Sequence, residues 1–463
     1  MTFCLQKLTL KNFRQFRELE IDFDESLTVL SALNGGGKST LVDAVAASLD
    51  AFVSGMLEEL PLGIEARDLR RIRAKDGSME LAGPASVEAV ARVGSRPVAW
   101  SVLRKSAGRG SKGYYLPAMR EIRESAEHHL QQVRDHASGK GSAPSLPILC
   151  VYGTHRLTAW EPSPSGADPK GEVTSRLRGY DGALSPSVNF LAFRQWFKGL
   201  SEQELIEMMR RRRRGESATH KRPAGERLDA VRAALSSLLQ PTGWDRLSWD
   251  FEGRTVVAEH PHHGVLPVAQ LSDGIKGVLA LAADIAHRCV RLNPQLGGRA
   301  PAETTGIVVI DEVDLFLHPQ WQQTIIDGLR ESFPKIQLIL TTHSPQVLST
   351  VKAEHIRVVR VDDDGAGTFS RPTQQTRGVE SADVLAAVMD VDPVPRVPES
   401  KLLSDYRALI SDGLANGPEA QALRVRLEEH FGPQHPVMLD CERLIRFQAF
   451  RVRTPPGPET SNR

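Results

Sequence analysis

The feature that most constrains the fold is a glycine-rich stretch near the N-terminus, SALNGGGKST, at residues 31–40. It follows a short apolar run at 27–30 and opens an apolar, alanine-rich stretch at 41–47 with helical spacing. A strand, a glycine loop, a Lys-Ser pair and a helix in this order predict a phosphate-binding P-loop. The glycines let backbone N–H groups surround an anion, and the helix N-terminus adds positive dipole character.

Each position of this loop has an expected role toward a nucleoside triphosphate. Lys38 supplies a point charge for the β- and γ-phosphates, and Ser39 is placed to hold Mg²⁺. One departure is visible, because Ala32 stands where the pattern has its first glycine. Alanine is the smallest step from glycine, so we expect an altered turn and a retained site; a glycine loop without a ligand is the alternative. The candidate nucleotide-binding residues here are Asn34, Gly35, Gly36, Gly37, Lys38, Ser39 and Thr40.

Length and charge limit the classes of protein. The 463 residues suffice for two or three domains, or for one large domain with insertions. The 58 Lys and Arg nearly cancel the 57 Asp and Glu, so nucleic acid would have to be bound by local patches. The four cysteines form no CxxC motif, and no apolar run approaches the ~18 residues of a membrane span. We therefore expect a cytoplasmic protein without membrane contact or signal peptide.

A buried strand ending in two acids follows far along the chain, at GIVVIDE, residues 306–312. A continuous apolar run is typical of a parallel strand that is covered on both faces. Asp311 at the strand's carboxyl end is expected to hold Mg²⁺, and Glu312 beside it to polarise the attacking water as a general base.

Two further segments are candidates for contacts to the phosphates of a nucleotide. LSDGIKG at 271–277 precedes a strong helix, so Ser272 and the Gly274 backbone can donate to phosphate oxygens at a helix N-terminus. A second apolar strand at 336–340 ends in Thr341-Thr342-His343. His343 at that position is expected beside the γ-phosphate.

Two other polar clusters leave alternatives open. Arg210–Arg214 directly follows a helical stretch with aromatic residues at packing spacing, and it is either a solvated loop or a patch that contacts nucleic-acid phosphates. His260, His262 and His263 could bind a metal, but the Pro and Gly around them favour a hairpin turn on the surface.

The order of the motifs resembles that of ABC-type ATPases. LSDG resembles their signature, which engages the nucleotide of the opposite subunit, and this role falls on Ser272, Asp273 and Gly274. The stretch DEVDLFLHPQWQ at 311–322 resembles ATPases of the overcoming-lysogenization-defect class, and His343 their switch histidine. The start LTLKNFRQF, residues 8–16, is similar to that of RecF and SMC-type ATPases, and it adds Arg14 as a candidate nucleotide contact.

A closer resemblance covers most of the chain by pattern. The segments YGTHR at 152–156, WFK at 196–198, LSDG and the C-terminal region resemble the PtuA ATPase family of Septu anti-phage systems, which also occurs with retrons. The resemblance implies a homodimer or higher oligomer and a separate HNH nuclease subunit, PtuB-like, as partner. The sequence has no HNH-like pair of its own and too few residues after His343 for a complete Toprim nuclease domain.

We thus expect an α/β P-loop ATPase head of ABC type, a mixed sheet flanked by helices, with a helical arm insertion and a C-terminal helical region. The expected segments are an N-terminal part of the ATPase domain with an antiparallel insertion (1–186), a helical arm with a basic loop (187–245), a second part of the ATPase domain (246–375), and a helical region and tail (376–463).

The expected function is Mg²⁺-dependent ATP hydrolysis by the sensor and scaffold of an anti-phage complex, with DNA or retron nucleic acid as a further partner through Arg210–Arg214. The alternatives are a RecF-like DNA-repair ATPase and a scaffold clamped by nucleotide without hydrolysis. An importer ATPase would require a membrane permease, for which the sequence gives no argument.

Overall fold

The computed structural model describes residues 2–33, 35–105, 112–154, 176–185, 190–214 and 222–453. Within it the chain divides into two compact units, Met1–Met389 and Asp390–Arg463. Of the predicted site residues, Asn34 lies outside the described residues, as do His155 and Arg156 of the YGTHR segment.

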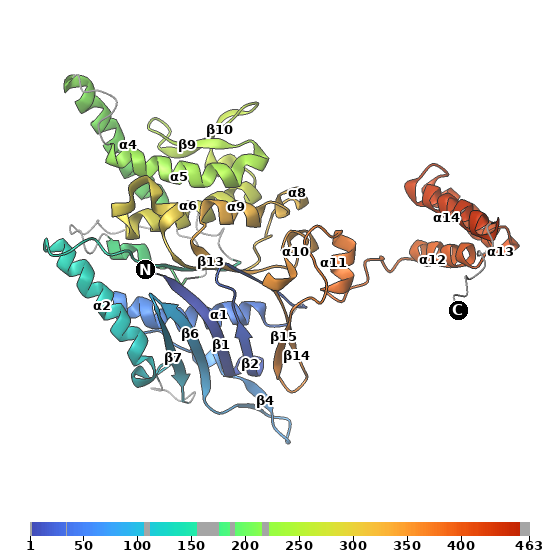
Figure 1. Cartoon of the computed structure of the whole chain (residues 1–463), viewed down its shortest axis with the longest axis horizontal. Coiled ribbons are helices and arrows are strands. Elements are labelled where there is room, and N and C mark those ends of the chain that lie inside the picture. Colours follow the sequence, from blue (N-terminus) through green and yellow to red (C-terminus); the bar gives the residue numbers. More distant parts are fainter. Residues whose placement is uncertain are drawn as a thin grey trace, which may run out of the picture. The chain divides into compact units, whose positions relative to one another are not determined.

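A six-stranded sheet forms the centre of the first unit (Figure 1). Its strands in spatial order are β15 (Gly367–Ser370), β14 (Ile356–Val361), β3 (Leu27–Ser31), β13 (Ile336–Thr341), β12 (Gly306–Ile310) and β8 (Ile148–Tyr152). Neighbouring strands are parallel except β15, which runs antiparallel to β14, so the expected mixed sheet is confirmed. All residues of β3, β8, β12 and β13 are buried, because layers on both faces cover these apolar runs.

Antiparallel strands make up the remaining sheets, including the predicted insertion. One sheet has the order β2 (Phe16–Asp22), β1 (Phe3–Phe13), β6 (Ala85–Val93) and β7 (Arg96–Arg104). The smaller ones are β4 (Arg71–Arg73) with β5 (Met79–Leu81), and β9 (Asp245–Asp250), β10 (Thr255–His260) and β11 (Gly264–Pro267). The histidine cluster lies at the turn between β10 and β11, as the hairpin prediction requires. Among the described residues, no group of three or more His, Cys, Asp or Glu side chains is placed to hold a metal ion.

Helices surround these sheets in the first unit. They are α1 (Lys38–Met56), α2 (Arg120–Ala137), α4 (Phe190–Arg214), α5 (Pro223–Leu239), α6 (Asp273–Leu292), α7 (Ala300–Glu303), α8 (Pro319–Gln322), α9 (Ile325–Ser332), α10 (Pro345–Leu348) and α11 (Ser381–Ala387). Short 3₁₀ helices lie at Ala66–Asp68, Leu116–Met119, Arg178–Tyr180, Gln240–Thr242, Val268–Gln270, Pro294–Arg299 and Ala353–His355.

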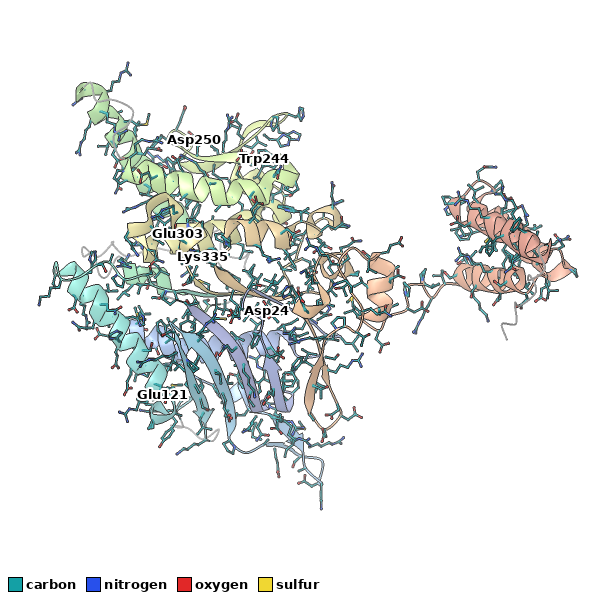
Figure 2. The ribbon with its side chains drawn as sticks, in the orientation of Figure 1. Asp24, Glu121, Trp244, Asp250, Glu303 and Lys335 are labelled. Carbon is teal, nitrogen blue, oxygen red and sulfur yellow. The ribbon has the colours of Figure 1, made fainter. Side chains whose placement is uncertain are left out.

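Helix α1 lies in the core, where it contacts β6, β7 and β8. Among the described helices it alone has the length and hydropathy of a membrane span, and most of it is buried inside the protein. Helix α2 covers α1 with Ile122, Ala126 and Leu130, while charged residues such as Glu121 point outward (Figure 2). This division of apolar and charged faces is that of an amphipathic surface helix.

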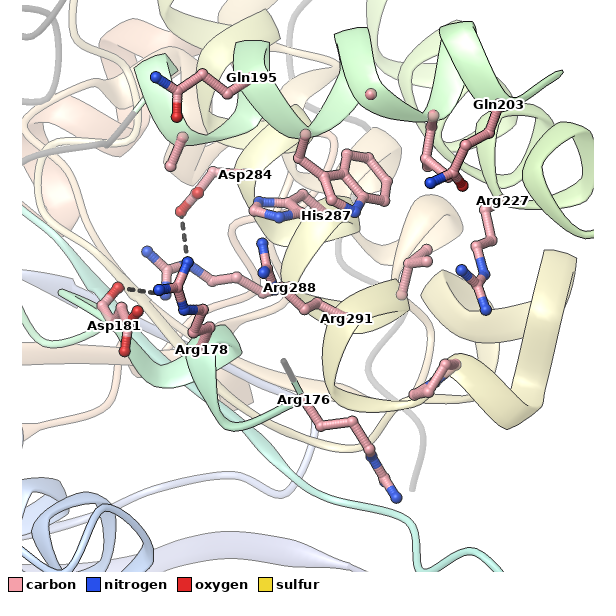
Figure 3. Close-up of a pocket in the computed structure, with 16 residues that line it drawn as sticks. Arg176, Arg178, Asp181, Gln195, Gln203, Arg227, Asp284, His287, Arg288 and Arg291 are labelled. Atoms are coloured by element: carbon pink, nitrogen blue, oxygen red, sulfur yellow. Dashed lines mark hydrogen bonds and ion pairs between the residues drawn. The ribbon is translucent and has the colours of Figure 1, made fainter. Parts of the chain in front are cut away.

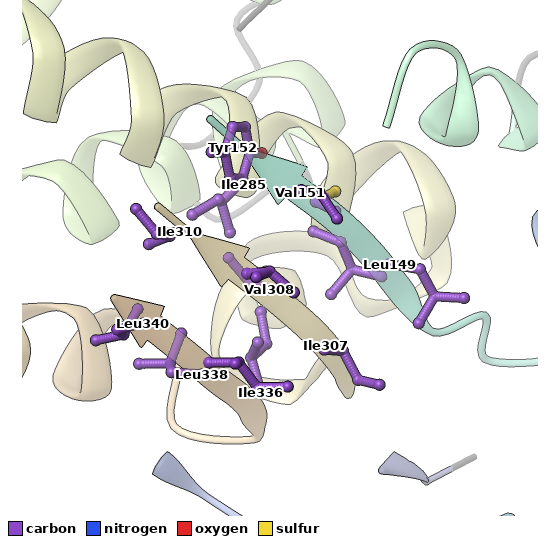
Figure 4. Close-up of a cluster of buried hydrophobic side chains, with 14 of the residues drawn as sticks. Leu149, Val151, Tyr152, Ile285, Ile307, Val308, Ile310, Ile336, Leu338 and Leu340 are labelled. Atoms are coloured by element: carbon purple, nitrogen blue, oxygen red, sulfur yellow. The ribbon is translucent and has the colours of Figure 1, made fainter. Parts of the chain in front are cut away.

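A tight apolar cluster joins the parallel strands to α6. Ile307, Val308 and Ile310 of β12 pack beside Leu338 of β13, and Ile285 of α6 covers them (Figure 4). Almost every residue of α6 from Gly277 to Leu292 is buried, so this helix needs a further layer on its outer side.

That further layer is the predicted arm. Helix α5 packs against α6 and α9 with Leu228, Val231 and Leu235 buried, and Phe193 and Phe197 of α4 are buried as the predicted packing face. Helix α5 of the expected arm therefore packs directly on the ATPase body.

The basic run also differs from the expected loop. Helix α4 continues through Arg214, and its later part carries exposed side chains, among them Met208 and Met209. Arginine is a good helix former, so the helix extends through the run that its charge alone assigned to a loop.

The second unit is a small helical bundle. It contains α12 (Pro398–Ser411), α13 (Pro418–Phe431) and α14 (Pro436–Arg453) around a separate core with Tyr406, Ile410, Leu427 and Met438. The unit begins at Asp390. Helix α11, which precedes it, packs on α10, and its Val384 belongs to the main core.

Candidate functional site

The P-loop connects β3 to α1 and wraps around Lys38. Gly36 N–H donates to the Leu33 carbonyl oxygen (2.9 Å), and Lys38 Nζ donates to the Ala32 carbonyl oxygen (2.8 Å). Lys38 is only 6% exposed, and its burial lowers its pKa, an effect that Asp311, Glu312 and Asp314 oppose. The site therefore places a cation beneath the loop and three carboxylates near it.

The hairpin between β1 and β2 closes over this loop. Gly37 has a φ of 94°, and a β-carbon at this position would overlap the Phe16 ring and the Gln15 amide. Gln15 Oε1 also accepts a hydrogen bond from Thr40 Oγ1 (2.9 Å). Gln15 is a site residue that the sequence analysis did not name, although it lies in the stretch LTLKNFRQF next to Arg14.

Ser39 and Asp311 meet at the carboxyl edge of the sheet. Ser39 Oγ donates to Asp311 Oδ2 (2.8 Å), although the two residues are 272 positions apart in the sequence. Asp311 is 4% exposed, and its Oδ1 accepts from Thr341 Oγ1 (2.5 Å). A hydroxyl and a carboxylate side by side are oxygen donors of the kind that Mg²⁺ prefers, so these residues fit that ion.

Parallel strand pairing brings Thr341 to this place. Ile310 pairs with Leu340, so the next residues on the two chain segments, Asp311 after β12 and Thr341 at the end of β13, are neighbours. Thr341 Oγ1 also accepts from the backbone N–H of Glu312 (2.7 Å). Thr341 thus holds the two acids in place, a role that the sequence analysis did not assign to it.

Glu312 has a strained backbone. Its φ is 48°, in the left-handed region, which costs a non-glycine residue about 1–2 kcal/mol. The half-buried side chain follows Asp311 at the strand end. Strain of this kind collects at functional sites, where the surroundings impose one side-chain direction.

His343 lies in the same electrostatic environment. It is half-buried, and burial followed by the charge of Lys38 lowers its pKa, against the opposing effect of Glu312, Asp314 and Asp311. We infer a neutral imidazole at pH 7, which can both donate and accept a hydrogen bond. Next to it, Thr342 Oγ1 donates to Asp314 Oδ1 (2.5 Å) and fixes the loop after the two acids.

The signature segment forms the N-terminus of α6. Ser272 is the N-cap residue, and Ser272 and Asp273 are exposed to solvent. Gly274 packs so closely on the Phe316 carbonyl group that a β-carbon would lie 2.5 Å from its oxygen. Phe316 thus covers one side of the helix start at Gly274, while Ser272 and Asp273 remain accessible from solvent.

Arg14 has other partners than expected for a nucleotide contact. Its guanidinium forms ion pairs with Asp43 of α1 (2.6 Å) and with Asp68 (2.9 Å). These pairs tie the β1–β2 hairpin to the helix that follows the P-loop.

Two protein families match separate parts of the chain, and each part contains some of the predicted motifs. Residues 7–134, which contain the P-loop, match a family described as "AAA domain". Residues 180–349, which contain the signature, Asp311 and His343, match a family described as "AAA domain, putative AbiEii toxin, Type IV TA system".

Several proteins are similar over nearly the whole chain. The "Retron Ec83 probable ATPase" of Escherichia coli is 26% identical, with 94% of this chain and 85% of that protein covered. The "Retron Vc95 probable ATPase" of Vibrio cholerae serotype O1 biovar El Tor is 24% identical, with 92% and 87% covered. The "Septu protein PtuA" of Bacillus mycoides (strain KBAB4) is 22% identical over 91% of this chain, which spans 49% of that longer protein.

Among solved structures, the SMC head domain from Thermotoga maritima overlaps 80% of this chain and 98% of its own, with 18% identity and a TM-score of 0.41. The assignment of the fold therefore rests on the strand order and the motifs of this chain and not on this structural similarity. The family resemblance stated from the sequence is confirmed by the retron and Septu relatives together with the two AAA matches. The chain is thus similar to P-loop ATPases of the overcoming-lysogenization and RecF-like class, and in particular to the retron ATPases and to Septu PtuA.

Proposed function

We propose that this protein is a cytoplasmic, Mg²⁺-dependent ATPase of ABC type that acts as the sensor and scaffold of an anti-phage defence complex. The observation that carries the proposal is the convergence of Lys38, Ser39, Asp311, Glu312 and His343 at one edge of the sheet. Direct contacts and shared electrostatic effects connect them, although they come from three separate stretches of sequence.

The chain's own residues divide the work of hydrolysis. The P-loop backbone and Lys38 bind the phosphates, and Ser39 and Asp311 would hold Mg²⁺, which supplies positive charge for the phosphoryl oxygens. Glu312 accepts the proton of the attacking water, and neutral His343 orients that water near the γ-phosphate. Thr341 keeps Asp311 and Glu312 in register for these roles.

The exposed N-terminus of α6 supports the ABC-type arrangement. Ser272, Asp273 and Gly274 face solvent wholly or in part, so a second copy could present its nucleotide to them. In that arrangement two chains enclose two ATP molecules, and ATP occupancy sets the position of whatever is bound to the heads.

The proposed role in anti-phage defence is supported by sequence similarity to the retron and Septu relatives. The retron and Septu relatives support a defence system, and the PtuA resemblance implies control of a separate HNH nuclease. The run Arg210–Arg214, with which α4 ends, is the candidate contact for DNA or retron nucleic acid. Purification from the native host tests the partner: an HNH protein should co-purify, and its reproducible absence would contradict the proposed nuclease control.

Replacement of the proposed base tests the chemistry. Glu312→Gln should lower ATP turnover about 10²- to 10⁴-fold while ATP binding persists, because only the proton acceptor is lost. Phosphate release and equilibrium binding of ATP measure the two effects. Glu429→Gln, the same change at an exposed residue of the second unit, is the matched control and should leave both unchanged.

Lys38→Ala should abolish ATP binding itself, since the phosphates lose their buried cation. If Glu312→Gln left turnover and phage defence unchanged, the protein would be a nucleotide-clamped scaffold and the proposed hydrolysis would be wrong.

A further inference from the structure

A short two-stranded ribbon extends from the first unit below the strands β1 and β2 in Figure 1. It consists of β4, β5 and the turn between them, and we call residues 71–81 the β4–β5 ribbon. All residues of both strands are exposed, so the strands place none of their side chains in the core. These side chains are therefore available to a partner.

The ribbon has a defined turn and a fixed base. In the turn, the N–H and the hydroxyl of Ser78 both donate to Asp76 Oδ1 (2.9 and 2.6 Å). At the base, the Arg70 N–H donates to the Asn12 carbonyl oxygen (3.0 Å). The ribbon is thus held on the β1–β2 hairpin that covers the P-loop.

One face of the ribbon carries cations and no carboxylate. The strand register pairs Arg71 with Leu81 and Arg73 with Met79, and directly paired residues lie on the same face. Glu80 lies on the opposite face, because successive side chains of a strand alternate. Within the described ranges, the side chains of Arg71 and Arg73 form no ion pair or hydrogen bond.

A third cation and an apolar surface adjoin the two arginines. Lys75 is exposed in the turn and likewise has no ion pair within the described part of the chain. Met79 is 61% exposed and Leu81 43%. Unpaired surface cations alone are typical of a solvated face, but large exposed apolar side chains among them indicate a contact surface.

The arginines of the cavity between α4 and α6 differ from those of the ribbon (Figure 3). This cavity has a volume of about 660 Å³. Arg176 donates to the Leu292 carbonyl oxygen, and Arg288 donates to Asp284 and to the Gly179 carbonyl oxygen. These two arginines thus stabilise the packing around α6, whereas Arg71 and Arg73 of the ribbon have no such contacts.

The charge of the ribbon matches an anionic partner, and its dimensions favour duplex DNA over an acidic protein. Arg71 and Arg73 are two residues apart on one strand, about 7 Å. This spacing is close to two base steps of about 3.4 Å each. The major groove of B-DNA admits a two-stranded ribbon, in which arginine can bind guanine and apolar side chains can contact thymine methyl groups.

We propose that the β4–β5 ribbon is an interface for duplex DNA and lies in the major groove. Arg71 and Arg73 are directed to the base edges beside Met79 and Leu81, and Lys75 is directed to a phosphate. This interface is separate from the run Arg210–Arg214 at the end of α4, and it does not depend on ATP hydrolysis.

Binding to the full-length protein without nucleotide tests the proposal independently of the ATPase chemistry. Fluorescence anisotropy is measured with a labelled DNA duplex of two helical turns, with an RNA duplex of the same sequence and with labelled polyglutamate. The DNA duplex should bind most tightly, because the major groove of A-form RNA is too deep and narrow for side chains to read. No binding of the DNA duplex, or equal or tighter binding of the RNA duplex or of polyglutamate, would overturn the proposal.

Variants of the full-length protein locate the contact. The ribbon variant replaces three cations by glutamine: Arg71→Gln, Arg73→Gln and Lys75→Gln. The matched control replaces two arginines and one lysine at exposed positions of the second unit: Arg396→Gln, Lys401→Gln and Arg407→Gln. In the ribbon variant, the slope of the logarithm of affinity against the logarithm of salt concentration should decrease by about 2–3, since each lost contact releases about one counterion fewer. The control should bind as the parent does.

A single added carboxylate tests the apolar part of the same face. Met79→Glu should weaken DNA binding about tenfold or more, because it places a negative charge beside the arginines. Val425→Glu, at a residue of the second unit that is 63% exposed, adds the same charge and should have little effect. Circular dichroism confirms that each variant is folded. Equal affinities of a ribbon variant and its control, or a loss confined to variants of Arg210–Arg214, would overturn the proposed interface.

Discussion

Gly37 ends the phosphate loop at a point that excludes any larger residue. Its φ of 94° disfavours a side chain, and a β-carbon would also overlap Phe16 and Gln15. Gly35 has a φ of 77° but no atom within 4 Å of its would-be β-carbon. A side chain at Gly35 would therefore meet backbone strain alone, whereas one at Gly37 would meet both backbone strain and steric overlap.

We predict that Gly37→Ala destabilises the nucleotide-free protein by about 3 kcal/mol or more, because overlap adds to the strain. Gly35→Ala should cost only the strain, about 1–2 kcal/mol. Urea unfolding of both variants gives the comparison. Similar losses for the two would show that the β1–β2 hairpin does not press on the loop.

Thr341 provides a second residue-scale prediction. Its hydroxyl is buried and bonds both Asp311 Oδ1 and the Glu312 N–H, so Thr341→Val leaves two polar groups without this partner. The free energy of unfolding should fall by about 1–3 kcal/mol, and ATP turnover should fall with it. Thr341→Ser keeps the hydroxyl and should retain most of the activity. Equal turnover of the Val and Ser variants would contradict a positioning role.

At the scale of elements, helix α6 is fixed by a buried ion pair. Arg288 and Asp284 lie one turn apart, with side chains 6% and 2% exposed, and Tyr152 at the end of β8 donates to the same carboxylate. Arg288 Nη1 also donates to the carbonyl oxygens of Gly179 and Asp181. The pair thus links α6 to the sheet and to the segment that precedes α4.

We predict that Asp284→Asn lowers the free energy of unfolding by about 3–5 kcal/mol, since Arg288 would remain buried without its counter-charge. Glu303→Gln breaks the pair of Arg299 and Glu303, in which the arginine is 70% exposed, and should cost less than about 1 kcal/mol. Denaturant titration of both variants measures the difference. A small loss for Asp284→Asn would contradict the anchoring role of the pair.

Elements with a strong local pattern could be predicted from the sequence. The apolar runs at 27–30, 306–310 and 336–340 are parallel strands because residues buried on both faces must be apolar. Because β12 and β13 are parallel neighbours, their carboxyl ends lie at the same edge of the sheet, and Asp311 lies near His343.

The remaining features depend on tertiary packing. The position of α5 follows from the need to cover α6, which is buried on nearly all sides, and the sequence of α5 alone does not show this. Gln15 reaches the P-loop only because the β1–β2 hairpin folds over it. The basic run continues α4 because arginine has a high helix propensity, which a run of like charges conceals in the sequence.

At the scale of the whole molecule, the ABC-type proposal gives the chain two halves of different nucleotide sites. In that proposal the P-loop and the acids form one half, and the exposed N-terminus of α6 forms the other. The N-terminus of α6 is suited to bind phosphate, and in this proposal its ligand is the ATP held by the P-loop of a second copy. The ABC-type proposal therefore makes assembly depend on nucleotide.

We predict that Glu312→Gln, which should bind ATP but hydrolyse it slowly, shifts from lower to higher mass when ATP and Mg²⁺ are added. The added species should contain at least one further copy, because each trapped ATP is held by two chains. Adding Ser272→Arg to Glu312→Gln should prevent the shift, since a large side chain would occupy the space of the second chain's phosphates. Ser138→Arg at the exposed end of α2 should not. Light scattering after size exclusion measures the masses with and without ATP. If the mass were independent of ATP in Glu312→Gln, or if Ser272→Arg had no more effect than Ser138→Arg, the α6 N-terminus would not be part of a shared ATP site.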